Sequence, residues 1–256
     1  MGHFSGTDIL GDIKQSAMPT SSGAVALPIL YRDGSMLVAG YRIDIARAQA
    51  ILGDLPFEPV LILGRALVLL TVFEYRDTTI GSYNEFGIGI LVQRAGTSPS
   101  LWRILHDIRK VEEVGLFVTN LPVTVQVAFT AGVELWGYPK YVTGINTSFG
   151  PDSVMTTLEH EIVVAHSRGF GLEMDGIPFV TFTRRQNRLI RTIVEVDHRV
   201  RFGGASSVSL SIIGDGPTAA TAKALGLDTV RPAFAFRTDA LKAILPAGKD
   251  LGSIKT

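Results

Sequence analysis

One lysine in an apolar and aromatic run is the residue of this chain best suited to covalent chemistry. Lys140 follows Trp136, Tyr138 and Pro139 and precedes Tyr141. No acidic residue lies within about five positions on either side. If the segment is buried, the ammonium loses its hydration, and the neutral amine is favoured. A neutral amine attacks carbonyl carbon and forms a Schiff base.

The elements around Lys140 decide between this chemistry and an ordinary solvated lysine, the usual state of this residue type. Residues 121–129 alternate apolar side chains as a strand does, and residues 131–132 then predict a turn. Pro139 fixes its own φ and favours an extended conformation at Tyr138. We therefore expect Lys140 to follow a core strand on a stiff backbone.

Two sequence blocks resemble one known family. The first runs from Gly132 to Lys140, GVELWGYPK. It is similar to the G-x-E-L-x-x-Y-P-K pattern of the acetoacetate decarboxylase family, whose lysine forms the Schiff base. The second block, residues 79–85, is TIGSYNE. It resembles the family's G-x-Y-x-E segment, whose glutamate faces the active site. With weaker matches near both ends, the resemblance covers roughly residues 25–248.

The resemblance implies roles for individual residues. Lys140 would be the nucleophile, and Glu85 would direct protonation and orient the substrate. Aromatic residues near these two would shape an apolar pocket and donate hydrogen bonds. No cofactor and no metal is expected. The expected substrate-binding residues are Arg32, Tyr83, Phe86, Trp136, Tyr138 and Tyr141.

Three positions depart from the family pattern. Tyr141 stands where the decarboxylases carry a second lysine, so the cationic neighbour that helps to activate the first lysine is absent. Gly34 stands where the family has an arginine, and Arg32, two residues earlier on the same strand face, is the expected replacement. Val133 replaces another family arginine. These changes favour a substrate that is bulkier and more apolar than acetoacetate.

Three functions remain open. The first is a carbon–carbon lyase that decarboxylates a β-keto acid. In this reaction Lys140 forms an iminium, which draws electrons from the carbon bearing the carboxylate. The second uses the same Schiff base for aldol, dehydration or cyclisation chemistry on a keto acid or polyketide-like ketone, which the wider superfamily allows. The third is a barrel that binds a small molecule without catalysis.

Composition limits partners and compartment. The 256 residues contain no cysteine, which excludes disulfides and thiol catalysis and suits a reducing, cytoplasmic compartment. Basic and acidic residues number 24 each, so nucleic acid is not an expected partner. No run of about 18 apolar residues predicts a membrane span, and the first residues do not resemble a secretory signal. Since only 19% of residues are charged, we expect a homo-oligomer that covers part of the surface.

Strand signals dominate the rest of the chain. The predicted helices are residues 45–52 (capped by Asp44 and ended by Gly53), 97–109, 217–224 and 239–245. Residues 30–40 are predicted to form two short strands around a turn at residues 33–34. The other predicted strands are residues 66–75, 84–93, 141–149, 153–159, 162–166, 178–184, 189–199, 206–213 and 230–237.

Strands that follow one another without a βαβ rhythm predict an α+β, mainly antiparallel β fold. We expect a closed, cone-like β-barrel with a few short flanking helices, which the resemblance also implies. Residues 1–27 are predicted to form an N-terminal arm. Residues 28–256 are predicted to form a single acetoacetate decarboxylase-like barrel domain.

Overall fold

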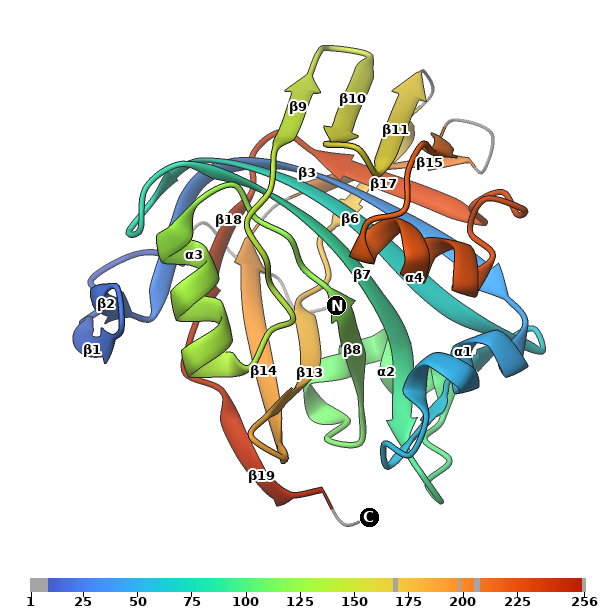
Figure 1. Cartoon of the computed structure of the whole chain (residues 1–256), viewed down its shortest axis with the longest axis horizontal. Coiled ribbons are helices and arrows are strands. Elements are labelled where there is room, and N and C mark those ends of the chain that lie inside the picture. The colour runs from blue at the N-terminus through green and yellow to red at the C-terminus, as the bar shows by residue number, and fades with distance from the viewer. Residues whose placement is uncertain (1–8, 168–169, 198, 205–207, 255–256) are drawn as a thin grey trace.

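The computed structural model describes residues 9–167, 170–197, 199–204 and 208–254. These residues form a closed barrel of seven strands, which confirms the predicted fold class (Figure 1). Neighbouring barrel strands are antiparallel except β8 and β13, which are parallel. Pairing of β3 with β6 closes the barrel. In order around the barrel, the strands are β3 (Ile29–Ile43), β18 (Lys242–Leu245), β14 (Arg188–Asp197), β13 (Phe179–Arg185), β8 (Val114–Asn120), β7 (Tyr83–Arg94) and β6 (Arg65–Thr78).

A second layer covers one side of the barrel wall. Two helices and a four-stranded sheet share one buried apolar cluster with β3, β6 and β7. These barrel strands therefore bury both faces, and their sequences are nearly continuous apolar runs, as in other sheets that are covered on both sides. The layer consists of α1 (Ile45–Leu52), α4 (Pro217–Leu225), β16 (Val208–Ile212), β11 (Ile162–Ser167), β10 (Ser153–Leu158) and β9 (Ile145–Phe149).

The remaining elements extend the barrel sheet or flank it. Within the described ranges, no helix is long and apolar enough to cross a membrane. The strands are β1 (Ser16–Thr20), β2 (Gly23–Leu27), β4 (Phe57–Pro59), β5 (Leu61–Ile62), β12 (Phe170–Asp175), β15 (Arg199–Gly204), β17 (Phe234–Thr238) and β19 (Lys249–Ser253). The helical elements are α2 (Leu101–Asp107), the 3₁₀ turn η1 (Ile108–Lys110), α3 (Gln126–Ala131) and the π-helical turn η2 (Gly132–Trp136).

The predictions hold best where a cap marks the end of an element. The helix predicted at residues 45–52 is α1, and the Asp44 carboxylate accepts a hydrogen bond from the Ala46 N–H at 2.8 Å. It ends at Gly53, whose φ of 54° favours glycine. The helix predicted from residue 217 is α4, and it ends at Gly226 with φ 72°. Local side-chain and backbone chemistry fixes these ends.

Two element predictions are wrong because pairing between strands outweighs local signals. Residues 30–40 do not form a hairpin. Instead, β3 runs through, and Asp33 and Gly34 form a bulge against β6. The helix predicted at residues 239–245 contains strand β18, which pairs with β3 on one side and β14 on the other. Helix propensity is a weak preference that such tertiary pairing overrides.

The strand predicted over residues 121–129 is wrong. The chain forms only an isolated bridge at Val123 and then enters α3. The apolar side chains of Val125, Val127 and Phe129 pack, partly buried, against the core cluster that also contains α3. A short apolar run fits the helical period as well as the strand period, so the alternation alone does not distinguish them.

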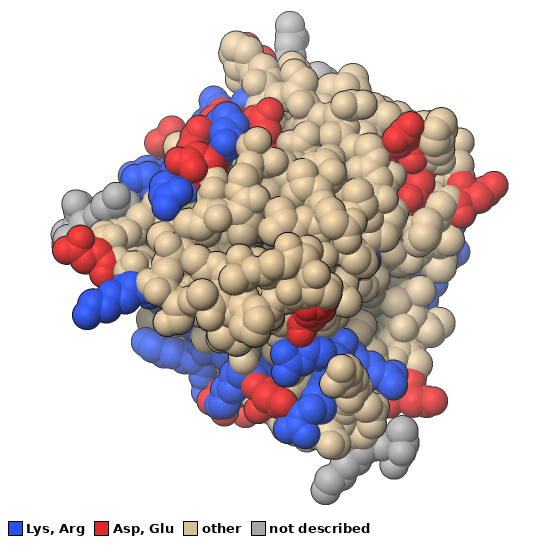
Figure 2. Space-filling model, turned by 60° about the vertical axis from the view of Figure 1, so that its left-hand side comes forward, with Lys and Arg blue, Asp and Glu red and all other residues tan. Residues whose placement is uncertain are grey.

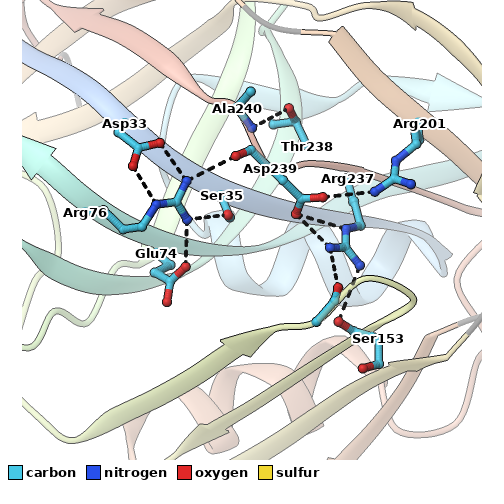
Figure 3. Close-up of polar contacts among 11 residues, drawn as sticks. Asp33, Ser35, Glu74, Arg76, Ser153, Arg201, Arg237, Thr238, Asp239 and Ala240 are labelled. Carbon is cyan, nitrogen blue, oxygen red and sulfur yellow. Dashed lines mark hydrogen bonds and ion pairs between the residues drawn. The ribbon is translucent and has the colours of Figure 1, made fainter.

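A polar network fixes the bulge in β3 (Figure 3). Arg76 on β6 donates two hydrogen bonds of 2.7 Å to the Asp33 carboxylate. Further bonds join it to the Ser35 hydroxyl, the Glu74 carboxylate and the Asp239 carbonyl. The hydrogen bonds from Arg76 lower the pKa of Asp33, so the pair is charged at neutral pH. The guanidinium of Arg76 is thus already hydrogen-bonded to residues around the bulge.

The same network continues to the turn between β9 and β10. Arg237, with a side chain only 1% exposed, donates to the Asp239 carboxylate at 2.7 Å. It also donates to the carbonyl oxygens of Gly150 and Ser153, and its guanidinium lies 5.7 Å from the centre of the Phe149 ring. The buried arginine therefore ties the four-stranded sheet to β17 of the barrel sheet.

Charged side chains are unevenly spread over the surface. Figure 2 shows one face with a broad, largely uncharged area and with lysine, arginine, aspartate and glutamate gathered toward its margins. Such an area is available for contact with another subunit. The homo-oligomer expected from the low charge content stays a prediction.

A buried carboxylate anchors α4 and the chain after Lys140. Glu161, 4% exposed, accepts hydrogen bonds from the backbone N–H groups of Thr218 and Ala219 at 2.7 and 2.8 Å. Its second oxygen accepts a hydrogen bond from the Tyr141 hydroxyl at 2.5 Å. A carboxylate at a helix N-terminus satisfies free N–H groups and interacts favourably with the helix dipole.

Replacing Glu161 with Ala should therefore destabilise the fold. Two buried N–H groups and the Tyr141 hydroxyl lose their acceptor, and we expect the free energy of unfolding in urea to fall by about 2–4 kcal/mol. The matched control is Glu159→Ala, because that side chain is 57% exposed. The control should change the free energy by less than about 0.5 kcal/mol. Equal losses in both variants would contradict the anchoring role of Glu161.

Candidate functional site

The backbone places Lys140 beside Glu85. Val123 forms an antiparallel bridge with Glu85 on β7 and a parallel bridge with Val142. Its N–H donates to the Tyr141 carbonyl at 2.9 Å. One short segment therefore joins β7 to the loop that carries the lysine. The relative position of the two side chains is fixed by main-chain hydrogen bonds.

Lys140 and Glu85 form a buried ion pair. The Lys140 Nζ donates to Oε2 of Glu85, and the two side chains are 6% and 8% exposed. The sequence near the lysine offers no acidic partner, but the fold supplies one from 55 positions earlier. Burying two charges is costly, and close pairing offsets that cost. Transfer of one proton from Nζ to Oε2 converts the pair into a neutral amine and a neutral acid.

Tyrosine hydroxyls surround the glutamate. Tyr75 on β6 pairs directly opposite Tyr83 on β7, and its hydroxyl donates to Oε1 of Glu85 at 3.4 Å. The hydroxyls of Tyr83 and Tyr31 are 3.1 Å apart. Sequence reasoning missed Tyr31 and Tyr75. A signal for Tyr75 was present in the sequence pattern. Tyr83 and Glu85 are two residues apart and share one face of their strand, so the residue opposite Tyr83 on the neighbouring strand lies at the same site.

These phenols stay protonated at neutral pH. Burial, with the nearby Glu85 charge, raises the pKa of Tyr31 and Tyr75 well above its ordinary value. Burial raises the pKa of Tyr138 to about 12. The Lys140 Nζ lies 5.9 Å from the ring centres of both Tyr83 and Tyr138. The ammonium of Lys140 thus lies near neutral tyrosine rings whose hydroxyl groups can donate hydrogen bonds.

The ion pair faces an apolar cavity of about 100 Å³. Gly87 and Gly89 lie on the same face of β7 as Glu85 and line the cavity, and a Cβ at Gly87 would lie 2.4 Å from Oγ1 of Thr71. Of the described residues that line the cavity, Lys140 is the one cation. The apolar lining consists of Leu69, Phe73, Ile88, Leu116, Val118, Leu121, Phe179, Val194, Val196, Leu241, Ala243 and Leu245.

The lysine stem packs against the π-helical turn η2. A Cβ added to Gly132 would lie 2.4 Å from Cε and 2.5 Å from Cδ of Lys140. The Gly132 carbonyl accepts a hydrogen bond from the Tyr138 N–H at 3.0 Å, which brings the chain back over the helix. Gly137 ends the turn with φ 70°. Glycine at position 132 therefore permits the close approach of the lysine.

Glu134 belongs to the same motif but does not line the cavity. Its carboxylate accepts hydrogen bonds from the Ser21 hydroxyl and from the Ser21 N–H, in the turn between β1 and β2. These bonds lower the pKa of Glu134. The hairpin of β1 and β2 is thereby held against η2. Among the described residues, no group of three or more His, Asp and Glu is placed to hold a metal ion.

Two predicted site residues lie outside the cavity on the barrel strands. Arg32 has a side chain 45% exposed and forms an ion pair with Asp77 at 3.3 Å. It does not line the cavity, so it does not replace the family's arginine there. Phe86 is fully buried on the opposite face of β7 from Glu85, within the outer apolar cluster. Adjacent residues on a strand face opposite sides, which explains this misplacement.

Two further predicted residues support the lysine loop and do not line the cavity. Trp136 is 1% exposed, and its Nε1–H donates to the Pro246 carbonyl at 2.8 Å. Tyr141 points to Glu161 and Thr218, with its hydroxyl 2.7 Å from the Thr218 Oγ1. Of the predicted set, the structure therefore brings together Lys140, Glu85, Tyr83 and Tyr138.

Several solved structures share the fold of this chain. Acetoacetate decarboxylase from Legionella pneumophila is 15% identical, with 88% of each chain covered and a TM-score of 0.65. An acetoacetate decarboxylase-like enzyme from Sphingomonas wittichii is 15% identical, with 88% of this chain and 94% of that chain covered and a TM-score of 0.61. At such identities the likeness concerns the fold.

A third similar structure is the enduracididine biosynthesis enzyme MppR, complexed with the condensation product of pyruvate and imidazole 4-carboxaldehyde. It is 14% identical, with 88% of this chain and 89% of that chain covered and a TM-score of 0.58. No curated protein sequence matches the chain. The model of the acetoacetate decarboxylase family matches residues 16–173, which is more than half of the sequence. The chain therefore belongs to the acetoacetate decarboxylase family.

Proposed function

We propose that the chain is a carbon–carbon lyase that forms a Schiff base through Lys140 and decarboxylates a β-keto acid bulkier than acetoacetate. The observation that carries this proposal is the buried pair of Lys140 and Glu85 at the wall of an apolar cavity. The pair provides a nucleophile and a proton acceptor in direct contact. The apolar wall provides affinity for the hydrocarbon part of a substrate.

The reaction begins with proton transfer from Nζ of Lys140 to Glu85. The neutral amine attacks the ketone carbon, and a proton moves from nitrogen to the new alkoxide to give a carbinolamine. Glu85 then returns its proton to the hydroxyl, which leaves as water, and an iminium and a carboxylate remain. The electrons of the bond to the carboxylate carbon move into the iminium, and carbon dioxide departs. Protonation of the enamine carbon and hydrolysis release the ketone and Lys140.

A second reaction is supported by the charges at the cavity. Once the iminium has formed, Glu85 balances it, and the described part of the cavity lining offers no further cation to pair with a substrate carboxylate. A neutral ketone would leave the site without net charge. Glu85 would then remove a proton from the carbon next to the iminium, and the resulting enamine would add to an aldehyde. MppR, a structural neighbour described with a condensation product of pyruvate, agrees with this aldol-type alternative.

Borohydride reduction in the presence of a ketone should attach the ketone to Lys140, because hydride traps the iminium. Peptide mass mapping should show the added mass at Lys140, and Lys140→Met should abolish it. Glu85→Gln should retain the adduct but form it about 10²–10⁴-fold more slowly, since the proton acceptor is lost.

Removing one member of a buried ion pair is itself destabilising by about 3–5 kcal/mol. The double variant Lys140→Met/Glu85→Gln removes both charges and serves as the folded control, checked by circular dichroism. Mass at Lys110 or Lys223 in place of Lys140 would refute the assigned nucleophile. Absence of any adduct across a series of ketones would favour the binding barrel without catalysis.

Gly132→Ala should lower activity by displacing Lys140. Alanine is favoured over glycine in a helix by about 1 kcal/mol, but its Cβ would displace the Lys140 stem. Displacement of a reacting group by about 1 Å can reduce the rate about 100-fold. Rates of borohydride trapping and urea titration together separate these effects. Gly171→Ala, whose Cβ meets nothing closer than 4.0 Å, is the control. An unchanged trapping rate in Gly132→Ala would contradict this packing argument.

Longer β-keto acids should be preferred to acetoacetate. Each buried methylene adds roughly 0.8 kcal/mol, so two or three more carbons should raise kcat/KM roughly tenfold or more. Gly89→Val should reverse the preference, since its side chain enters the cavity where an added Cβ already lies 3.5 Å from the Leu116 Cβ. The assay compares acids of about four to ten carbons and scores carbon dioxide and ketone consumption separately. Acetoacetate as the best substrate would contradict the size preference, and consumption without carbon dioxide would identify the aldol-type reaction.

A further inference from the structure

We propose that a second site, a surface cleft at the far end of β3, binds a ligand that carries a pyrophosphate group. The cleft has a volume of about 690 Å³. It is formed by the end of β3, the start of α1, the start of β6 and the chain that follows α4. The residues that carry the argument are Arg42, Arg47, Arg65, Arg231, Asp44 and Gly226.

The first argument is charge. Four guanidinium groups and one carboxylate line the cleft, which gives four minus one, or three net positive charges. The chain as a whole has a formal net charge of zero. Four separate segments supply the arginines, so they do not form a single charged run along one helix or loop. Concentrated positive charge of this kind raises the local concentration of anions.

The second argument is that these arginines are available. Within the described part of the chain, Arg42 and Arg231 have no hydrogen bond or ion pair from their side chains. Arg65 lies 3.7 Å from Asp44, and both side chains are more than half exposed. Arg47 donates one bond of 3.3 Å to the Ala224 carbonyl. Exposed ion pairs contribute little, so an anionic ligand would compete with few existing contacts.

Two other arginines, Arg76 and Arg109, differ from those in the cleft because carboxylates already bind their guanidinium groups. Arg76 donates two bonds to Asp33, and Arg109 donates two bonds to Asp107 and a third to Glu195. Those guanidinium groups are already matched by carboxylates. In the cleft, one carboxylate faces four guanidinium groups, so most of their donors remain free for a ligand.

The third argument is chemical fit. Guanidinium groups bind phosphate oxygens through two parallel hydrogen bonds, which a lysine ammonium does not reproduce. Pyrophosphate carries enough negative charge to balance three net positive charges, whereas a single carboxylate does not. Gly226 helps to leave room, because a Cβ there would lie 2.6 Å from Nη1 of Arg47. The cleft is therefore shaped and charged for a ligand with several anionic oxygens.

The cleft is separate from the apolar cavity. Tyr31 and Arg42 lie 11 residues apart on the continuous strand β3. At about 3.3 Å per residue, the strand between them is roughly 36 Å long, and the described linings of the two sites have no residue in common. The proposal therefore does not depend on the proposed reaction of Lys140, and its test measures binding alone.

Isothermal titration calorimetry of the full chain with sodium pyrophosphate tests the proposal. We expect submillimolar affinity that weakens as potassium chloride is raised, since salt screens exposed charges. The variant Arg42→Ala/Arg231→Ala should weaken the affinity at least about tenfold, because two guanidinium groups are lost. The matched control is Arg94→Ala/Arg103→Ala, which removes two exposed arginines outside the cleft and should keep the affinity within about twofold.

Arg42→Lys/Arg231→Lys keeps the charge and should bind between the wild type and the alanine variant, since only the paired hydrogen-bond geometry is lost. Circular dichroism confirms that each variant is folded. No binding by the wild type, or an equal affinity in the cleft and control variants, would overturn the proposal. Sulfate that binds as tightly as pyrophosphate would also overturn it, because the cleft would then show no preference for the larger charge.

Discussion

A lysine and a glutamate that are buried side by side in an apolar wall constrain the rest of this structure. Each buried charge is costly without the other, so the fold must place Lys140 and Glu85 in contact. They come from distant segments, and the bridge at Val123 is what brings those segments into register. Closure of the barrel and the return of the chain over η2 also help to place Lys140 against Glu85. The stability of the fold and the chemistry of the site thus share one interaction.

The distribution of positive charge gives this pair its chemical character. Arg32 and Arg76 lie on the barrel strands near the site, but Asp77 and Asp33 pair with them outside the cavity. Among the described residues that line the cavity, Lys140 is the one cation, and neutral phenols lie beside it. Under the proposed function, such a site would bind a carbonyl compound mainly through its hydrocarbon part. The departures from the family pattern at positions 34 and 141 therefore act in the same direction, toward a less polar pocket.

The sequence predicted features with local causes and missed those set by register. The residues Asp44 and Gly226 correctly predicted helix ends, and the resemblance pointed to Lys140 and Glu85, which the structure places in contact. Phe86 was misplaced because strand parity was not applied to the residue next to Glu85. Tyr31 was beyond reach, because its place depends on the closure of β3 on β6 and not on any neighbour in sequence. Strand β18 was missed for a related reason, since its pairing partners lie far away along the chain.

The π-helical turn makes the length of the segment before the lysine as important as its composition. A π-turn accommodates one more residue than an α-turn. Loss of one residue from η2 would either convert the wide turn to a tight one and remove its wider hydrogen-bond pattern, or rotate the following chain by about 100° about the helix axis. Lys140 lies only a few residues beyond, with Pro139 stiffening the path, so no loop is available to absorb the change. The number of residues in η2 is therefore constrained as tightly as the glycine at position 132.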